Sequence, residues 1–92
     1  MILSFRCRET DALHLGFSSR KFQAIERSAR TRLARLQAAT DLGDLRAVPG
    51  NRLELLKGDR AGQHSIRIND QWRICFTWRE GNAYDAEIAD YH

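Results

Sequence analysis

The feature that most constrains the fold is a pair of alternating segments joined by a tight turn. Residues 63–69 read QHSIRIN and residues 71–78 read QWRICFTW, and apolar and polar side chains alternate along both segments. A period of two is typical of β-strands with one buried face. The Asn-Asp turn between the segments is too short for a crossover connection, so the strands must be antiparallel. We therefore predict a hairpin with one apolar face and one polar face.

Strand-like segments also flank this hairpin. RLELLK at residues 52–57 precedes it and ends at the turn-like GDRAG, and AYDAEIADYH at residues 83–92 follows the turn-like REGN. Short connections between successive strands are typical of an antiparallel meander. Trp72 and Trp78 share the parity of the apolar side chains, which favours packing in the core. The alternative is that one of them stacks on a nucleobase.

The first half of the chain is expected to be mainly helical. ILSFRC at residues 2–7 predicts a first strand. Residues 10–17 are ambiguous, since Thr10 or Asp11 could cap a single helical turn before Gly16. Residues 18–40 predict a long amphipathic helix with a basic outer face, because their apolar side chains recur at spacings of three and four. This apolar stripe comprises Phe22, Ile25, Ala29, Leu33 and Leu36. Residues 41–51 contain a Pro-Gly pair and are expected to be a connector.

These segments together predict the fold class. The chain has 92 residues, which is the length of one small domain. Helices that precede a run of antiparallel strands are typical of α+β proteins. We therefore predict a single α+β domain over residues 1–92, in which an N-terminal strand and helices pack on a twisted antiparallel sheet.

The polar face of the predicted sheet is rich in cations. Arg67 and Arg73 alternate with the apolar positions, and Lys57 and Arg60 lie in the adjoining turn. The stretch from Arg52 to Arg79 has six basic and three acidic residues, and the whole chain has a net charge of +3. Guanidinium groups pair bidentately with phosphate, so this face suits a phosphodiester backbone. A solvated face with local ion pairs is the alternative explanation.

The chain ends on three side chains that can move protons, Asp90, Tyr91 and His92, directly after the last predicted strand. An RNA phosphodiester can be cleaved without a metal if a base takes the 2′-hydroxyl proton, an acid protonates the leaving 5′-oxygen and a cation stabilises the phosphorane. Histidine titrates near neutral pH, aspartate can orient it or act as base, and Arg73 can stabilise charge. Alternatively, the tyrosine packs and the histidine simply ends the chain.

No metal or cofactor is expected. His14 and His64 are far apart in the sequence, and no histidine pair has the helical spacing of metal ligands. Cys7 and Cys75 lie in separate apolar segments and are expected to be buried free thiols, as is usual in the cytoplasm. A disulfide between them is the alternative. A charge at residue 6 and the absence of a long apolar run predict a soluble cytoplasmic protein that does not contact a membrane.

Taken together, LKGDRAG, INDQWRICF and the ending DYH resemble the HigB branch of the RelE-type toxins, which belong to bacterial toxin–antitoxin pairs. The likeness extends over nearly the whole chain. It implies a RelE-like microbial ribonuclease fold and a small ribonuclease that cleaves messenger RNA in the ribosomal A site. It also implies a HigA-like helix-turn-helix antitoxin as partner, with DNA contacted only indirectly through that antitoxin.

Carried over to this chain, the resemblance implies that Lys57 and Arg73 are phosphate-facing cations. It makes Asp90, Tyr91 and His92 the catalytic cluster, to which we add Arg73 as the stabilising cation. The RNA-binding residues are then expected to be Lys57, Arg60, Arg67 and His64.

One departure from the family pattern concerns Glu54. Some HigB-like toxins have a histidine two residues after the Arg of the RL pair, where this chain has Glu54. A carboxylate can accept a proton but repels phosphate, so either activity is weaker here or another residue, such as His64, fills the role. We expect a ribosome-dependent messenger-RNA endoribonuclease. The alternative is a non-catalytic basic module that binds RNA or an antitoxin.

Overall fold

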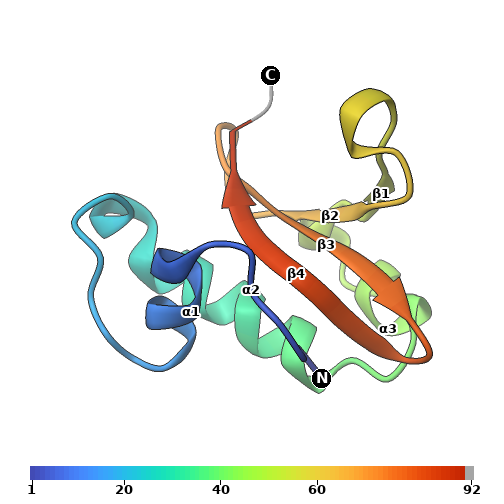
Figure 1. The fold of residues 1–92 in the computed structure, drawn as a ribbon, viewed down its shortest axis with the longest axis horizontal. Helices are drawn as coiled ribbons and strands as arrows, with labels where there is room; N and C mark the ends of the chain where they lie inside the picture. The colour runs from blue at the N-terminus through green and yellow to red at the C-terminus, as the bar shows by residue number, and fades with distance from the viewer. Residues whose placement is uncertain (91–92) are drawn as a thin grey trace.

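The computed structural model describes residues 1–90 and consists of a four-stranded antiparallel sheet with helices packed on one face (Figure 1). The α-helices are α1 (Arg8–His14), α2 (Glu26–Ala38) and α3 (Leu42–Arg46). The short 3-10 helices are η1 (Gln23–Ile25), η2 (Pro49–Asn51) and η3 (Gly58–Arg60). The strands are β1 (Glu54–Leu55), β2 (His64–Arg67), β3 (Arg73–Arg79) and β4 (Asn82–Ala89), in the spatial order β1-β2-β3-β4. The predicted α+β class and antiparallel meander are confirmed.

The core lies between α2 and the inner face of the sheet. The predicted apolar stripe of α2 and η1 is buried along its whole length. It packs with Ile66, Ile74 and Phe76, which alternate on one face of β2 and β3. The ring of Trp72 meets Phe22 edge-on at 5.3 Å, and Trp78 meets Phe76 at 6.3 Å. Both tryptophans therefore pack against the core, as their parity predicted.

A β-bulge sets which side chains of β4 face outward. Asp85 has a positive φ of 54°, and the pairing of β3 with β4 shifts register at this point. Ala83 and Ala86 are both fully buried although they are three residues apart, so the bulge resets the alternation. Beyond it, Ile88 is buried in the core and Glu87 lies on the opposite, outer face.

The long helix predicted over residues 18–40 is shorter in the structure. The α-helix begins only at Glu26 and is preceded by the single 3-10 turn η1. Arg30 of α2 donates hydrogen bonds to the carbonyls of Leu13 (3.2 Å) and Phe17 (2.9 Å). These bonds hold the chain between α1 and η1 against α2. The prediction was wrong here because tertiary hydrogen bonds outweigh the helical preference of residues 18–22.

The predicted N-terminal strand is present only as two isolated parallel bridges to β4, Ile2 with Ala83 and Phe5 with Ala86. Figure 1 shows this first segment running beside β4, so it covers what would otherwise be an open sheet edge. The helix that follows is also longer than the expected single turn. Thr10 lies within it, fully buried, and its hydroxyl accepts the backbone N–H of Ile88 at 3.0 Å.

Residues 41–51, expected to be a connector, include α3. The carboxylate of Asp41 accepts the N–H of Asp44 at 3.0 Å, and the carboxylate of Asp44 accepts the N–H of Asp41 at 3.3 Å. This reciprocal capping box explains why so short a segment forms a helix. The pKa of Asp44 is lowered because its carboxylate accepts hydrogen bonds from the N–H and the hydroxyl of Thr40 and from the N–H of Asp41. Within residues 1–90, no helix has the length and apolar character needed to cross a membrane.

Candidate functional site

The outer face of the sheet carries a row of side chains to which every strand contributes one residue. The strand register pairs Glu54 with Ser65, Ser65 with Cys75, and Cys75 with Glu87. The parity that sends Ile74 and Phe76 into the core directs this row away from the helices. Although they point away from the helices, Ser65 and Cys75 are buried, so the centre of the outer face is not accessible to solvent.

Arg73 lies in the next row, between Arg67 and Ala89, and its guanidinium is held by protein oxygens. Nε donates to Oγ of Ser65 at 2.7 Å, and Nη2 donates to the backbone carbonyl of Arg52. The side chain is only 12% exposed. The predicted outward direction of Arg73 is thus confirmed, and the residue is a fixed cation on the polar face.

Arg60 reaches across the outer face from η3 to β4. Its Nη1 lies 2.8 Å from Oε1 of Glu87 and donates a second hydrogen bond to Gln63 at 3.2 Å. The two side chains of the ion pair are only 26% and 19% exposed. The 3-10 helix η3 lies in the connection between β1 and β2. The ion pair with Glu87 of β4 therefore crosses β2 and β3 and holds this connection against the outer face of the sheet. Glu87 was not singled out in the sequence.

The Cys75 thiol lies at the centre of this arrangement. Burial raises its pKa, and the charges of Arg60, Glu87 and Arg73 act on it as well. A thiol that keeps its proton is a poor nucleophile, so Cys75 is a packing residue. Cys75 and Cys7 are both unpaired, which confirms the expected free thiols, although Cys7 is half-buried instead of buried.

The end of β4 lies beside Arg73. Ala89 is the cross-strand neighbour of Arg73, and Asp90 follows it directly. The carboxylate of Asp90 accepts a hydrogen bond from Nε2 of Gln71 at 3.2 Å. Tyr91 and His92, the other two members of the predicted cluster, lie outside the described residues.

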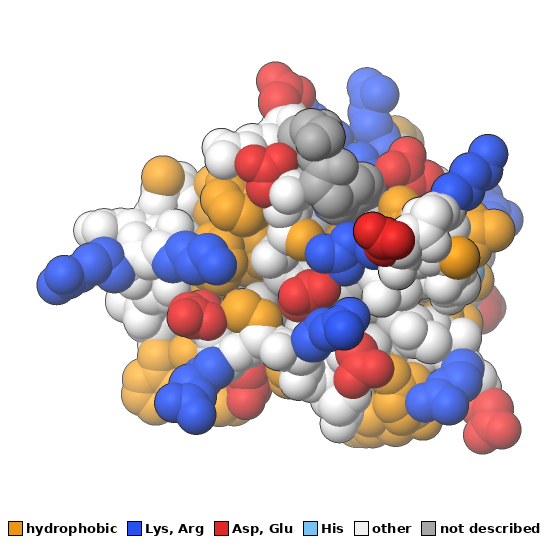
Figure 2. Space-filling view, turned by 45° about the horizontal axis from the view of Figure 1, so that its top comes forward, with side chains coloured by type: hydrophobic (Ala, Val, Ile, Leu, Met, Phe, Trp, Pro, Cys, Tyr) orange, Lys and Arg blue, Asp and Glu red, His pale blue; other side chains and the backbone are white. Residues whose placement is uncertain are grey.

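The outer face is less uniformly basic than its composition suggests. Arg67 pairs with Asp70, and Oε1 of Glu54 lies 3.9 Å from Nε of Arg73. Glu54 is 53% exposed and so remains close to both solvent and the guanidinium. Figure 2, turned so that the top of Figure 1 comes forward, shows acidic and basic side chains interspersed. Lys57, by contrast, is exposed, and within residues 1–90 it has no ion pair.

His64 lies on the other face of the sheet, apart from Arg73. Its ring stacks on Phe76 with the centroids 6.2 Å apart. Within the part of the chain that the structure describes, its buried Nδ1 has no hydrogen-bond partner. Burial lowers the pKa of His64 below its ordinary value of 6.5, and the charge of Arg46 lowers it further. The neutral imidazole is therefore favoured.

The pKa of His64 predicts that the fold weakens as the pH falls. Below pH 6.5 the unfolded chain binds a proton at His64 more readily than the folded chain does. The free energy of unfolding therefore decreases as the pH falls through this range, and the stability contributed by the neutral His64 is lost. Urea titrations at pH 5.5 and 7.5 should show a larger loss for the parent than for His64→Phe, which keeps a ring against Phe76. Equal losses would show that His64 does not contribute.

Three of the four arginines of α2 make hydrogen bonds that hold the fold together. Besides the two carbonyl bonds of Arg30, Arg32 donates to the carbonyl of Arg67 at 3.2 Å, and Arg35 donates to Oδ1 of the fully buried Asn51 at 3.3 Å. The charge pattern of the predicted helix does not distinguish such bonds from a basic outer face. The bond from Arg32 also supports the strand that carries Ser65.

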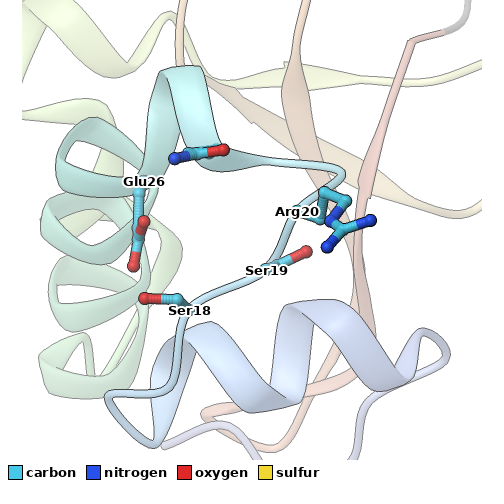
Figure 3. Close-up of a pocket in the computed structure, with 5 residues that line it drawn as sticks. Ser18, Ser19, Arg20 and Glu26 are labelled. Atoms are coloured by element: carbon cyan, nitrogen blue, oxygen red, sulfur yellow. The ribbon is translucent and has the colours of Figure 1, made fainter.

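A separate hollow of about 330 Å³ lies in the helical layer (Figure 3). Its lining residues are Ser18, Ser19, Arg20, Gln23 and Glu26. The carboxylate of Glu26 is already paired with Arg30 at 2.7 Å. Within residues 1–90, no group of three His, Cys, Asp or Glu side chains is placed to hold a metal ion. Among the described residues singled out in the sequence for chemistry, Glu54, Arg60, Arg67 and Arg73 lie on or over the outer face of the sheet, and none of them lines this hollow.

Solved structures resemble this fold. A chain of the YoeB-YefM complex from Staphylococcus aureus matches 100% of this chain and 98% of its own length, with a TM-score of 0.53. At 16% sequence identity, this likeness supports the fold alone.

Curated relatives carry closer sequence similarity. Toxin HigB-1 of Vibrio cholerae serotype O1 is 45% identical over 65 residues, which are 71% of this chain and 68% of the relative. Endoribonuclease HigB of Proteus vulgaris is 41% identical over 61 residues, which are 66% of this chain and 65% of the relative.

A family model covers more of the chain than either relative does. The model for the RelE-like toxin of type II toxin-antitoxin system HigB matches residues 6–92, which include all four strands of the sheet and the terminal triplet. The predicted resemblance to HigB-like toxins is thereby confirmed. The chain belongs to the HigB family of RelE-like toxins of type II toxin–antitoxin systems.

Proposed function

We propose that the protein is an endoribonuclease that cleaves messenger RNA on the ribosome and acts as the toxin of its toxin–antitoxin pair. The observation that carries the proposal is the position of Arg73. Its guanidinium is held on the polar face of the sheet, directly across from Ala89 and so beside the start of the terminal triplet. Membership of the toxin family and the endoribonuclease name of the Proteus vulgaris relative support the same activity.

The proposed reaction needs no metal. A base removes the proton of the 2′-hydroxyl, the freed oxygen attacks the adjacent phosphorus, and an acid protonates the departing 5′-oxygen. We assign these proton transfers to Asp90, Tyr91 and His92, with Asp90 orienting the imidazole. Arg73 stabilises the additional negative charge on the phosphorane. The products are a 2′,3′-cyclic phosphate and a 5′-hydroxyl, so the protons balance without a co-reactant.

Substrate binding is assigned to the cations that surround Arg73. Lys57 is exposed and available to a phosphate. Arg60 and Arg67 already pair with Glu87 and Asp70, so an RNA phosphate would have to share or replace these carboxylates. We leave His64 out of this surface because its ring packs against Phe76 on the helix-covered side.

The proposed partners follow from the family. A type II toxin is controlled by a cognate antitoxin, for which we propose a HigA-like helix-turn-helix protein. Contact with DNA would then be indirect, through that antitoxin. The ribosome supplies the messenger RNA in its A site, which places the proposed action in the cytoplasm.

A second function, binding without cleavage, is favoured by one specific observation. Glu54 lies 3.9 Å from Nε of Arg73 and would repel a phosphate that approaches the guanidinium. A protein of this kind would bind RNA or the antitoxin but lack turnover. Glu54→Gln separates the two functions. If the parent protein already cleaves, removing the charge should speed cleavage, whereas if Glu54 keeps the protein a binder, the parent should show no cleavage and the variant should gain it.

The chemistry of the RNA ends tests the proposal directly. We expect purified protein to cut messenger RNA on programmed ribosomes and to leave 2′,3′-cyclic phosphate ends, detected by mass spectrometry of the fragments. A substrate with a single 2′-deoxy nucleotide at the cut site should resist cleavage because it lacks the nucleophile. Products with 3′-hydroxyl ends, or cleavage of the deoxy substrate, would contradict the mechanism. Intact messenger RNA under all conditions would favour the binding module.

A further inference from the structure

The side chain of Ser65 is buried beneath the Arg73 guanidinium. It is fully inaccessible to solvent, and its Oγ accepts a hydrogen bond from Arg73 Nε at 2.7 Å. Ser65 lies two residues before Arg67, the cross-strand neighbour of Arg73, so its hydroxyl reaches the guanidinium diagonally across the β2–β3 pair. This is a short hydrogen bond between a buried hydroxyl and a cation on the face where the chemistry is proposed.

A second contact fixes the remaining freedom of the guanidinium. Nη2 of Arg73 donates to the backbone carbonyl of Arg52, the residue that ends η2 in the left-handed conformation, with φ at 44°. A guanidinium is planar, so one bond at Nε and another at Nη2 determine both its plane and its direction. Within residues 1–90, Nη1 donates no hydrogen bond. That edge of the group is the one left for a ligand.

We propose that Ser65 is a positioning residue for RNA cleavage, whose hydroxyl holds Arg73 so that its Nη1 edge faces the scissile phosphate. This inference rests on the proposed function, because it needs Arg73 to act on the phosphate. Ser65 itself does not touch the substrate. Stabilisation of a developing charge depends on donors that are already oriented when the charge appears, so a guanidinium that can turn stabilises it less well.

The first test concerns geometry alone and does not depend on activity. In ¹⁵N-labelled toxin, the Arg73 Nε–H should exchange slowly with water because Ser65 accepts it in a buried setting. We expect Ser65→Ala to speed this exchange by about tenfold or more, since the hydrogen bond then has no acceptor. We expect Ser65→Thr, which keeps the hydroxyl, to stay close to the parent. Unchanged exchange in Ser65→Ala would overturn the proposal.

The second test measures the reaction. In single-turnover cleavage on programmed ribosomes, Ser65→Ala should lower the maximal rate by about 10- to 100-fold, because small misplacements of a reacting group have effects of this size. The ribosome concentration at half-maximal rate should change little, since the charge of Arg73 is retained. Thr77→Ala is the matched control, because it removes a hydroxyl from β3 outside the contacts of Arg73 and should cleave at the parent rate. Ser65→Thr should recover most of the activity.

The outcomes distinguish this inference from the function on which it rests. If Arg73→Ala cleaves normally, both the proposed role of Arg73 and that of Ser65 fail. If Arg73→Ala is inactive but Ser65→Ala cleaves at the parent rate, only the positioning role fails. If Thr77→Ala loses as much cleavage rate as Ser65→Ala, the loss reflects a general loosening of the sheet, and the positioning role of Ser65 also fails. If Ser65→Ala does not fold, Ser65→Thr and Ser65→Cys are compared instead. Because sulfur is a weak hydrogen-bond acceptor, Ser65→Cys should cleave more slowly than Ser65→Thr, and its Arg73 Nε–H should exchange faster.

Discussion

Arg73→Ala is expected to lower the rate of messenger-RNA cleavage by about 10²- to 10³-fold, the usual effect of removing one oriented donor from a developing charge. The guanidinium is held on the outer face by protein oxygens at Nε and Nη2, and its side chain is only 12% exposed. Single-turnover assays on programmed ribosomes measure this effect. Arg73→Lys keeps a positive charge but not the fork of donors and should fall between the parent and Arg73→Ala.

The same substitution should also lower stability. It leaves the buried hydroxyl of Ser65 and the carbonyl of Arg52 without the donor that they now share, at a cost of about 1–3 kcal/mol. Thermal melting should therefore shift downward while circular dichroism at 25 °C still reports a folded protein. An Arg73→Ala protein that is folded and cleaves at the parent rate would remove Arg73 from the mechanism.

Deletion of His92 is expected to have an effect of similar or larger size, about 10²- to 10⁴-fold on the cleavage rate, if the imidazole is the general acid or base. The structural support is that the end of β4 lies beside Arg73, with Ala89 opposite Arg73 and Asp90 hydrogen-bonded to Gln71. A general acid or base acts on the substrate and not on the fold, so the melting temperature should change little.

The matched comparison for this deletion uses the other members of the terminal triplet. Asp90→Asn keeps the size of the side chain and its contact with Gln71 but removes the charge that would stabilise an imidazolium, so it should also slow cleavage. Tyr91→Phe separates the phenol hydroxyl from the ring. Single-turnover rates and thermal melts are measured together for each variant. A His92 deletion with the parent rate and the parent melting temperature would contradict a role for the terminal imidazole.

Several features of the fold could be predicted because they depend on local pattern. The alternation in residues 63–69 and 71–78 predicts the central hairpin and directs Arg73 and Arg67 away from the core, as the structure confirms. The apolar stripe of α2 is likewise a matter of spacing along one helix. Trp72 and Trp78 follow the same parity into the core. Each of these inferences needs only the period of a helix or strand.

Other features depend on contacts between segments that are far apart in the sequence. The start of α2 is determined by bonds from Arg30 to the α1 region, and the position of the N-terminal segment by its bridges to β4. The capping box of α3, formed by Asp41 and Asp44, is a local signal that is present in the sequence. The prediction of a connector over residues 41–51 overlooked it. The remaining differences arise because helical preference is weak compared with tertiary hydrogen bonds.

The sequence by itself determined the residue types of the candidate site, because guanidinium, carboxylate, phenol and imidazole groups limit the chemistry that the outer face can perform. Only the tertiary structure decided how the cations are held. It placed Ser65 beneath Arg73, carried Arg60 across the sheet to Glu87, and left His64 on the opposite face. A hydrogen bond or an ion pair depends on distances of a few ångströms between segments, and the register, the β-bulge and the loop paths that set those distances form only when the whole chain packs.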